Sequence, residues 1–384
     1  VGSTALGTLN YDGAGYNTAV GYAAGTAVTT GTYNTLVGGL AGDALTDGES
    51  NVAIGYGALS TEDQADANVA VGVNALATQN VSTGESYNTA VGQNAGRYVT
   101  TGITNTLIGA LAGDALTDAD ENAALGSYSL TTDTQGSKSV AVGHGSLATQ
   151  NFTTATNSYN TAVGYVAGNL ITTGITNTLI GGLAGDALTD ADENVAVGSY
   201  SLTADTLGSK STAVGHGTLA TQNFTTATDS LNTAIGYVAG NAITTGTGNT
   251  LIGAYAGDAL TDGASNTAVG KYALSAVCTG NDNTAVGQQA LLTNTSGASN
   301  TGLGVDALKL NTDGNYNIAV GDSAMLGNDG GDRNVAIGYQ ALDYGDQNDC
   351  VAIGYTALSA NQGSSNVAVG SYALDVNAAG TQNT

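Results

Sequence analysis

The feature that most constrains this chain is a repeat of about 17 residues that runs through nearly its whole length. The phrase Asn-Thr-Ala-Val-Gly at Asn17 to Gly21 returns, with small changes, at Asn34, Asn51 and Asn68. About 22 such repeats can be counted from Ser3 onward. A fixed period of this length is typical of a solenoid, in which each repeat forms one coil stacked on the next.

Three of the spacings between repeats are longer than the others, and each carries a similar insert. The inserts lie near residues 77–87, 148–159 and 220–231 and open with Thr-Gln-Asn. A second period, made of four coils plus one insert, is therefore superimposed on the first. Because insertions at one coil position map to one side of a solenoid, we expect the inserts to lie in a row.

Two positions of the repeat are almost fixed in residue type. The fifth is Gly in every repeat that reaches it, and the first is Asn in most of them. Strict glycine indicates positive φ or a corner too tight for a Cβ atom. Asparagine tolerates the left-handed region, and stacked Asn side chains can form a hydrogen-bonded ladder. We therefore predict structural corners at Asn17, Gly21, Asn51, Gly55, Asn160, Gly164, Asn334 and Gly338.

The residues between those corners alternate in the manner of a short strand, as in Thr18-Ala19-Val20. Frequent Gly, Thr and Val oppose a helix. The chain is therefore predicted to be all-β, a single continuous parallel β-solenoid (β-roll or β-helix) over residues 1–384. Since the Ala face of this strand is also apolar, we expect it to pack against another copy of the chain. The pattern starts and stops within a repeat, which predicts a fragment incomplete at both ends.

A second regularity predicts a packed interior of constant volume. Where the ninth position is Leu, as at Leu59, the twelfth is usually polar. Where the ninth position is Gly, as at Gly96 and Gly168, the twelfth is aliphatic, as at Val99 and Ile171. Such compensation is what a core of fixed volume requires.

Composition and charge narrow the classes of protein further. With 41% hydrophobic residues and 10% charged residues, the chain does not have the composition of a disordered protein. A formal net charge of −25 repels phosphate, so nucleic acid is not an expected partner, and it favours solubility. No apolar run reaches the length of a membrane span. Cys278 and Cys350 lie about five coils apart, which excludes a disulfide between them within one chain.

The repeat Asn51-Val52-Ala53-Ile54-Gly55-Tyr56-Gly57-Ala58-Leu59, and the matching stretch from Asn334 to Leu342, resemble the head repeats of YadA-like trimeric autotransporter adhesins. Similar repeats occur in the shafts of phage tail-fibre proteins. The resemblance implies a left-handed parallel β-roll, three chains side by side, and attachment to surfaces. The coils here are longer than the family's repeat of about 14 residues, and the three inserts are additional.

Metal binding is the first candidate chemistry. Carboxylates on stacked turns can hold calcium. The acidic stretches predict candidate calcium ligands at Asp114, Asp118, Asp120, Glu121, Asp186, Asp190, Asp192 and Glu193, against the alternative of a solvated acidic corner. His144 and His216 occupy the same coil position, so three copies of either could meet on a metal in a threefold assembly; the alternative is a solvated corner residue.

Glycosylation and aromatic contacts are two further candidates. Asn-x-Ser/Thr sequences make Asn80, Asn151, Asn223 and Asn294 glycosylation candidates, with chance occurrence as the alternative. Tyrosines recur before the Asn corner and after the Gly corner. Stacked Tyr rings would stiffen the solenoid, and exposed rows would also suit contacts with glycans.

These observations predict a structural or adhesive fibre rather than an enzyme, with no catalytic residues and no cofactor. It is expected to be extracellular or at the cell surface, to associate with itself as a homotrimer or filament, and to contact surface glycans or matrix. One alternative is the shaft of a virion tail fibre. Another is an ice- or mineral-binding solenoid, which needs a regular Thr array; here other residues interrupt the Thr row.

Overall fold

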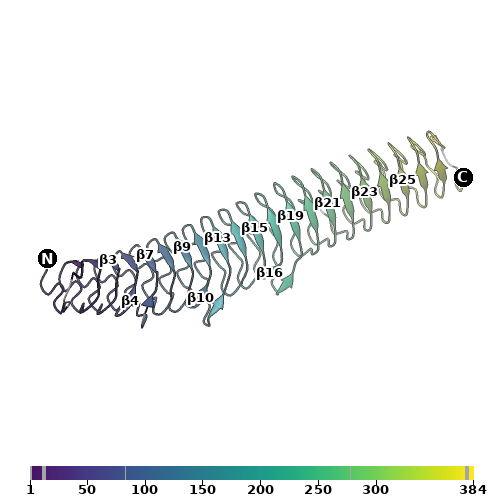
Figure 1. The fold of residues 1–384 in the computed structure, drawn as a ribbon. Helices are drawn as coiled ribbons and strands as arrows, with labels where there is room; N and C mark the ends of the chain where they lie inside the picture. The colour runs from purple at the N-terminus through teal and green to yellow at the C-terminus, as the bar shows by residue number, and fades with distance from the viewer. Residues whose placement is uncertain (1, 11–13, 83, 277, 377–379) are drawn as a thin grey trace. The chain divides into compact units, whose positions relative to one another are not determined.

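The computed structural model describes residues 2–10, 14–82, 84–276, 278–376 and 380–384. It divides into two compact units, Val1–Glu193 and Asn194–Thr384. Each unit is a stack of coils joined by parallel strand pairing (Figure 1). The described residues form no helix, and their strands are two or three residues long. The predicted all-β parallel solenoid is confirmed.

Among its described residues the first unit has fourteen strands. They are β1 (Thr18–Val20), β2 (Thr35–Val37), β3 (Val52–Ile54), β4 (Ala65–Asp66), β5 (Val69–Val71), β6 (Gly84–Glu85), β7 (Thr89–Val91), β8 (Thr106–Ile108), β9 (Ala123–Leu125), β10 (Gly136–Ser137), β11 (Val140–Val142), β12 (Thr156–Asn157), β13 (Thr161–Val163) and β14 (Thr178–Ile180).

The second unit has thirteen strands in the part that the structure describes. They are β15 (Val195–Val197), β16 (Gly208–Ser209), β17 (Thr212–Val214), β18 (Thr228–Asp229), β19 (Thr233–Ile235), β20 (Thr250–Ile252), β21 (Thr267–Val269), β22 (Thr284–Val286), β23 (Thr301–Leu303), β24 (Ile318–Val320), β25 (Val335–Ile337), β26 (Val351–Ile353) and β27 (Val367–Val369).

The three-residue strands occupy positions two to four of each repeat and pair in register with the neighbouring coil. Thr18 lies opposite Thr35, for example, and Thr233 opposite Thr250. There are 21 strands of this kind among the described residues. The repeat count of about 22 exceeds this number by one because the repeat that begins at Ser3 forms turns and no described strand.

The third position of each repeat, which is the middle residue of the strand, points into the coil. The expectation that the Ala face packs against another copy is therefore wrong. Ala53 and Ala141 are completely buried within their own unit, as is Leu107 at the same position. The alternation of a strand therefore places positions two and four on the outer side. The Ala face is the core of the coil, so it is not the face available to another copy.

The core is completed by the eighth, ninth and twelfth positions. Leu59 at a ninth position is fully buried, and so are Val99 and Ile171 at the twelfth position of coils that have Gly at the ninth. A Cβ atom added at Gly96 would lie 3.3 Å from Val99 Cγ2 and 2.7 Å from Leu107 Cδ1. Either residue pattern fills the same space, which confirms the predicted volume compensation.

The invariant fifth-position glycines form the sharp corner after each strand. Gly21, Gly55, Gly164 and Gly338 have φ values of 139°, 135°, 147° and 133°, in the region that favours glycine. A Cβ atom at Gly164 would lie 2.3 Å from the carbonyl oxygen of Gly181 in the next coil. Both predicted reasons for glycine, positive φ and a close backbone approach, are present.

The first-position asparagines form the predicted ladder at the opposite end of the strand. Asn34 Oδ1 accepts a hydrogen bond from Asn51 N at 2.9 Å, and Asn51 Nδ2 donates to the carbonyl oxygen of Ala65 at 2.9 Å. Asn17, Asn160 and Asn334 make the same two kinds of bond. These amides satisfy backbone groups in two coils at once.

The left-handed residue at this corner is the one before the asparagine. Tyr16, Ser50, Tyr159 and Arg333 have φ values of 49°, 59°, 51° and 57°, whereas the four corner asparagines that follow them do not have positive φ. Asparagine is therefore required here for its side-chain amide rather than for its tolerance of the left-handed region.

Candidate functional site

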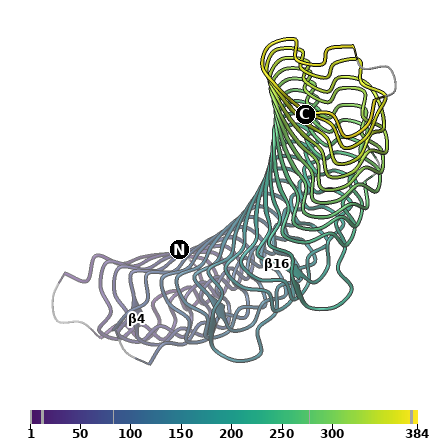
Figure 2. The same cartoon turned by 90° about the vertical axis from the view of Figure 1, so that its right-hand side faces the viewer.

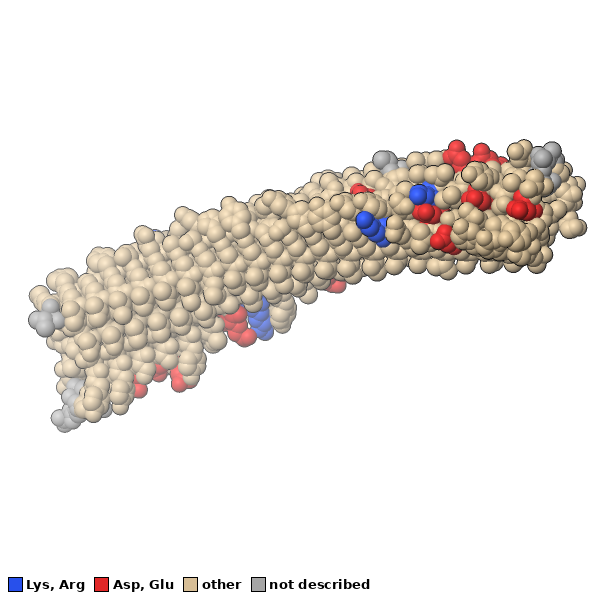
Figure 3. Space-filling model, turned by 90° about the horizontal axis from the view of Figure 1, so that it is seen from above, with Lys and Arg blue, Asp and Glu red and all other residues tan. Residues whose placement is uncertain are grey.

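The outer face of the long sheet repeats the same two outward positions on each three-residue strand that the structure describes. Every three-residue strand places Thr, Val, Ile or Ala at position two and Val, Ile or Leu at position four. The position-four side chains are partly exposed: Ile54 is 38% exposed and Ile235 39%. No three-residue strand among the described residues carries a charged residue at either outward position. Seen from above, the charged side chains in Figure 3 gather in a few places, mainly toward one end, and leave uncharged surface between them. The outer sheet face is thus largely apolar and without charge.

Aromatic side chains flank this face just after the Gly corner. In the first unit the His144 ring lies 5.7 Å from the rings of both Tyr128 and Tyr165. In the second unit neighbouring rings form a continuous row with centroid distances of 4.9 to 5.8 Å, made of Tyr200, His216, Tyr237, Tyr255 and Tyr272. Several neighbours stack face to face, so the rows support the predicted stiffening more than a platform for sugars.

The most specific polar arrangement lies where the inserts leave the coils. Asp133, at the twelfth position of its coil, is completely buried. Its Oδ1 atom accepts hydrogen bonds from Gly136 N and Phe152 N, each at 3.0 Å, and its Oδ2 atom accepts one from Gln150 Nε2 at 2.6 Å. Gln150 Oε1 in turn accepts from Asn160 Nδ2 at 2.9 Å. One carboxylate therefore joins its own coil to the start of the insert.

The same arrangement recurs in the second unit. Asp205 Oδ1 accepts from Gly208 N at 3.1 Å and from Phe224 N at 3.0 Å, and Asp205 Oδ2 accepts from Gln222 Nε2 at 2.5 Å. Gln222 Oε1 accepts from Asn232 Nδ2 at 2.9 Å. We call these two groups of residues, each centred on a buried Asp and Gln, the insert anchors.

The first insert has a related anchor built on a longer acid. Glu62 is completely buried, and its Oε1 atom accepts from the backbone nitrogens of Asp63, Gln64 and Ala65 at 2.8 to 3.2 Å. Its Oε2 atom accepts from Val81 N at 3.3 Å. The acid again holds the first residues of the insert, although residue 83 of the insert 77–87 lies outside the described residues.

Each insert adds a short strand beside the preceding coil. β4 pairs with β6, β10 with β12 and β16 with β18, all in parallel. β4 and β10 lie along the same edge of the first unit (Figure 1), and beyond β16 in the second unit a loop leaves the outline of the coils (Figure 2). Within the first unit, the prediction that the inserts share one side is confirmed.

Sequence reasoning missed the insert anchors. A detectable signal is an acid at the twelfth position of the coil before each insert, followed by Gln at the twelfth position of the next coil, as in Asp133 and Gln150. In the repeat pattern, a polar residue at the twelfth position is explained by the presence of Leu at the ninth position alone, so the pattern does not predict a role of its own for that residue. Burial of the acid is not expected from sequence because lone carboxylates rarely enter a core.

The structure does not bring the predicted calcium ligands together. Asp120 and Asp192 use Oδ1 to accept from the backbone nitrogens of Ile103 and Ile175, each at 2.8 Å. Glu121 is a left-handed corner residue with φ of 59°, and Glu193 is its counterpart with φ of 58°. These four acidic residues shape turns.

The remaining candidate acids lie at other positions of the coils. Asp118 accepts from Thr117 Oγ1 at 2.8 Å, and Asp190 accepts from Thr173 Oγ1 at 2.5 Å. Asp114, whose pKa is raised by burial, accepts from the Thr131 hydroxyl, and Asp186 is half-buried. Within the ranges that the structure describes, no group of three or more His, Cys, Asp or Glu could hold a metal ion.

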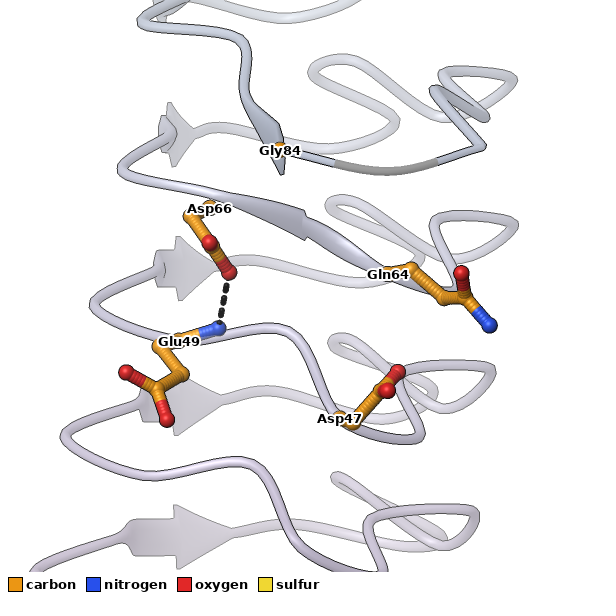
Figure 4. Close-up of a pocket in the computed structure, with 5 residues that line it drawn as sticks. All are labelled: Asp47, Glu49, Gln64, Asp66 and Gly84. Atoms are coloured by element: carbon orange, nitrogen blue, oxygen red, sulfur yellow. Dashed lines mark hydrogen bonds between the residues drawn. The ribbon is translucent and has the colours of Figure 1, made fainter.

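An acidic hollow lies beside the first insert. It has a volume of about 260 Å³ and is lined by Asp47, Glu49, Gln64, Asp66 and Gly84. Figure 4 shows Asp66 pointing back to the preceding coil, where it accepts a hydrogen bond from Glu49 N at 2.6 Å. The hollow is open and anionic, with no nucleophile or histidine among its lining residues.

The four glycosylation candidates separate into two kinds. Asn80, Asn151 and Asn223 are exposed at the thirteenth position of the coils that carry inserts. Asn294 is completely buried, and its Nδ2 atom donates to the carbonyl oxygen of Gly297 at 2.9 Å and to Cys278 Sγ at 3.3 Å. Of the four, only the first three are accessible in the folded chain.

The two cysteines offer no reactive site. Cys278 and Cys350 are buried free thiols. Burial raises the pKa of both thiols, which makes them poor nucleophiles at neutral pH.

Comparison with known proteins gives no family for the chain. No protein-family model matches it, and no curated protein matches it significantly. Among the described residues, no helix is long and apolar enough to cross a membrane.

Proposed function

We propose that this chain is a non-enzymatic structural or adhesive fibre component that associates with further copies of itself, as a homotrimer or a filament, outside the cell or at its surface. The observation that carries the proposal is the outer sheet face, which is largely apolar and uncharged on every three-residue strand described in the two units. Contiguous exposed apolar surface of this extent is characteristic of protein association.

The distribution of charge supports the same conclusion. A chain with a formal charge of −25 repels its own copies, yet its acids lie at the turns and inserts rather than on the outer sheet face. Because each strand presents the same two outward positions, copies lying side by side in the same direction would meet with like rows facing each other. This geometry agrees with the resemblance to trimeric adhesin heads and to tail-fibre shafts.

The experiment is the mass of the native particle, measured by sedimentation equilibrium at physiological ionic strength. A particle of three chains, or a longer assembly, is expected. The variant Ile235→Lys, Ile252→Lys places two charges on the outer sheet face and should yield monomers. The matched control Thr226→Lys, Ala227→Lys places the same charges on an exposed insert and should leave the mass unchanged. A monomeric wild-type particle would refute self-association.

One observation favours a second candidate, a solenoid that binds ice or a mineral surface. At the second position of the repeat, Val, Ile or Ala replaces Thr on several strands. In the second unit, however, six successive strands carry Thr in register: Thr212, Thr233, Thr250, Thr267, Thr284 and Thr301. Neighbouring strands are about 4.8 Å apart, so these side chains form a regular array. Binding to a lattice needs this face to be free. Inhibition of ice recrystallisation by a monomeric particle would favour this candidate.

A further inference from the structure

We propose that Asn151 and Asn223, together with Asn80, are acceptors for N-linked oligosaccharide, and that Asn294 is not. The proposal rests on the extracellular location given under the proposed function, because glycosyl transfer of this kind accompanies secretion. All four residues begin an Asn-x-Ser/Thr sequence, so sequence alone does not distinguish them.

The insert anchors fix how Asn151 is presented. Its neighbours Gln150 and Phe152 are both buried, the first through its side-chain amide and the second through its ring and its backbone nitrogen. Asn151 N donates to the carbonyl oxygen of Thr172 at 2.9 Å. With inward side chains on both sides and its backbone held, the Asn151 side chain points outward.

The reactive nitrogen is unengaged at this position. Asn151 Oδ1 accepts a hydrogen bond from Thr134 Oγ1 at 3.2 Å, and Asn223 Oδ1 accepts one from Thr206 Oγ1 at 3.1 Å. These bonds orient each carboxamide through its oxygen. Neither Nδ2 atom donates to any residue within the described ranges.

The rest of each sequence motif is also accessible. Thr153 and Thr225, two residues beyond the acceptors, are exposed and lie where the chain turns away from the coil. Asn80 and Ser82 are exposed in the same way at the first insert. A transferase could therefore reach the acceptor and the hydroxyl residue together without unfolding a coil.

Asn294 has the opposite environment. It lies at the inward twelfth position, and its Oδ1 atom accepts from Asn311 Nδ2 at 2.8 Å. Its Nδ2 atom is occupied by two partners, and the side chain is completely buried. An oligosaccharide attached there would prevent the coil from closing.

The reaction needs a lipid-linked oligosaccharide diphosphate as donor. A bond forms between Asn Nδ2 and C1 of the first sugar, while the bond from C1 to the diphosphate oxygen breaks. The diphosphate leaves with the bonding electron pair, and Nδ2 loses one proton to a base on the transferase. No oxidation or reduction takes place.

The test expresses the full chain through a eukaryotic secretory pathway, with a flexible Gly-Asn-Gly-Thr tail as an internal control for transferase access. Peptide mass mapping before and after treatment with peptide N-glycosidase, which converts each modified Asn to Asp, reports occupancy at each site. We expect modification at Asn80, Asn151 and Asn223 and none at Asn294. The variants Thr153→Ala and Thr225→Ala should each abolish one glycan.

Occupied tail sequences with bare Asn151 and Asn223 would overturn the proposal, as would an occupied Asn294 in folded material. The native mass of the deglycosylated particle is measured on the same sample. That value tests self-association separately, so failure of the glycan sites and failure of the proposed fibre function give different results.

Discussion

The side-chain nitrogen of Gln150 lies 2.6 Å from Oδ2 of Asp133, and both residues are completely buried. The other carboxylate oxygen of Asp133 accepts two backbone N–H groups, one in its own coil and one in the insert. A single acid thus fixes the point at which the chain leaves the regular path of the coil. The equivalent pair Asp205 and Gln222 follows four coils further along the chain, in the same relation.

Replacing Asp133 with Ala should therefore destabilise the insert. Three buried donors lose their acceptor, and each unsatisfied group costs about 1–3 kcal/mol, so a loss of about 3 kcal/mol or more is expected. Hydrogen exchange at Phe152 N should accelerate in the Asp133→Ala variant. Asp118→Ala, which removes an acid from the surface, is the control and should change stability by less than about 0.5 kcal/mol. Equal effects of the two variants would contradict this account of the anchor.

A fifth-position glycine should tolerate no side chain. In Gly164→Ala the new Cβ atom would lie 2.3 Å from the carbonyl oxygen of Gly181, on a backbone with φ of 147°. Strain and the clash together should cost about 3 kcal/mol or more, measured by chemical denaturation. The control Gly182→Ala places a Cβ atom where nothing lies within 4 Å, at a residue without positive φ. A loss of stability in Gly164→Ala no larger than that in Gly182→Ala would show that the backbone at the corner can shift to accept a side chain.

The volume compensation between the ninth and twelfth positions can be tested by a double-mutant cycle. Ile171→Ala should cost about 2–5 kcal/mol because it empties a filled core site. Gly168→Leu alone should overpack the site, since a Cβ atom there already lies 3.2 Å from Ile171 Cδ1. Together the two changes reproduce the Leu pattern of other coils and should restore much of the loss. If the free-energy costs of the two single substitutions simply add in the double variant, the side chains at the ninth and twelfth positions do not fill the same space.

The buried Asp343 carboxylate should make stability depend on pH. It is 7% exposed, and burial raises its pKa to about 6 from 3.8, while Oδ1 finds no partner among the described residues. Because the folded state binds this proton more tightly, its contribution to stability rises as pH falls from 7 toward 4. At pH 7 the charged form costs about 3 kcal/mol.

Asp343→Asn should therefore raise the stability at pH 7 and make little difference near pH 4, where the folded protein carries the acid in its protonated form. Urea denaturation of both proteins at the two pH values measures this. Asp322→Asn, a change at an acid on the surface, provides the comparison. A gain that is the same at pH 4 and pH 7 would exclude titration of Asp343 as its cause.

Much of the fold was predictable because each coil repeats the same physical requirements. The recurrence of Gly164 and its counterparts indicated a backbone constraint at the corner. Coils with Gly at the ninth position, such as Gly168, have an aliphatic residue at the twelfth, whereas coils with Leu there, such as Leu59, usually do not; this compensation indicated a core of fixed volume. The side of the strand that faces inward was predicted wrongly. In a three-residue strand, Ala at position three and Val or Ile at position four are both apolar, so the pattern alone does not select the buried face.

The polar sites were harder to predict for a different reason. Asp133 and Asp120 are both acids near turns, yet one is a buried anchor and the other accepts a backbone N–H from the neighbouring coil. Their roles depend on residues in adjacent coils, such as Gln150 and Ile103, which lie one 17-residue repeat away from Asp133 and Asp120. The repeat spacing places these residues side by side, but it does not show whether the acid between them is buried or exposed. The recurring acidic stretch grouped Asp120 with candidate calcium ligands, whereas in the structure Asp120 shapes a turn.

The asparagine ladder has a consequence for how such chains change over evolutionary time. Most coils are joined to the next through the same kind of bond as that between Asn34 and Asn51. After the first positions occupied by Ser139 and Ser211, the next coil is held by a serine instead, because Asn160 N and Asn232 N donate to Oγ of Ser158 and Ser230. A cassette of four coils plus one insert begins and ends in the same phase of that ladder. Unequal recombination between cassettes would change the copy number, and each new junction would repeat one that the chain already contains. Length and the number of displayed inserts are then inherited together, as one countable trait.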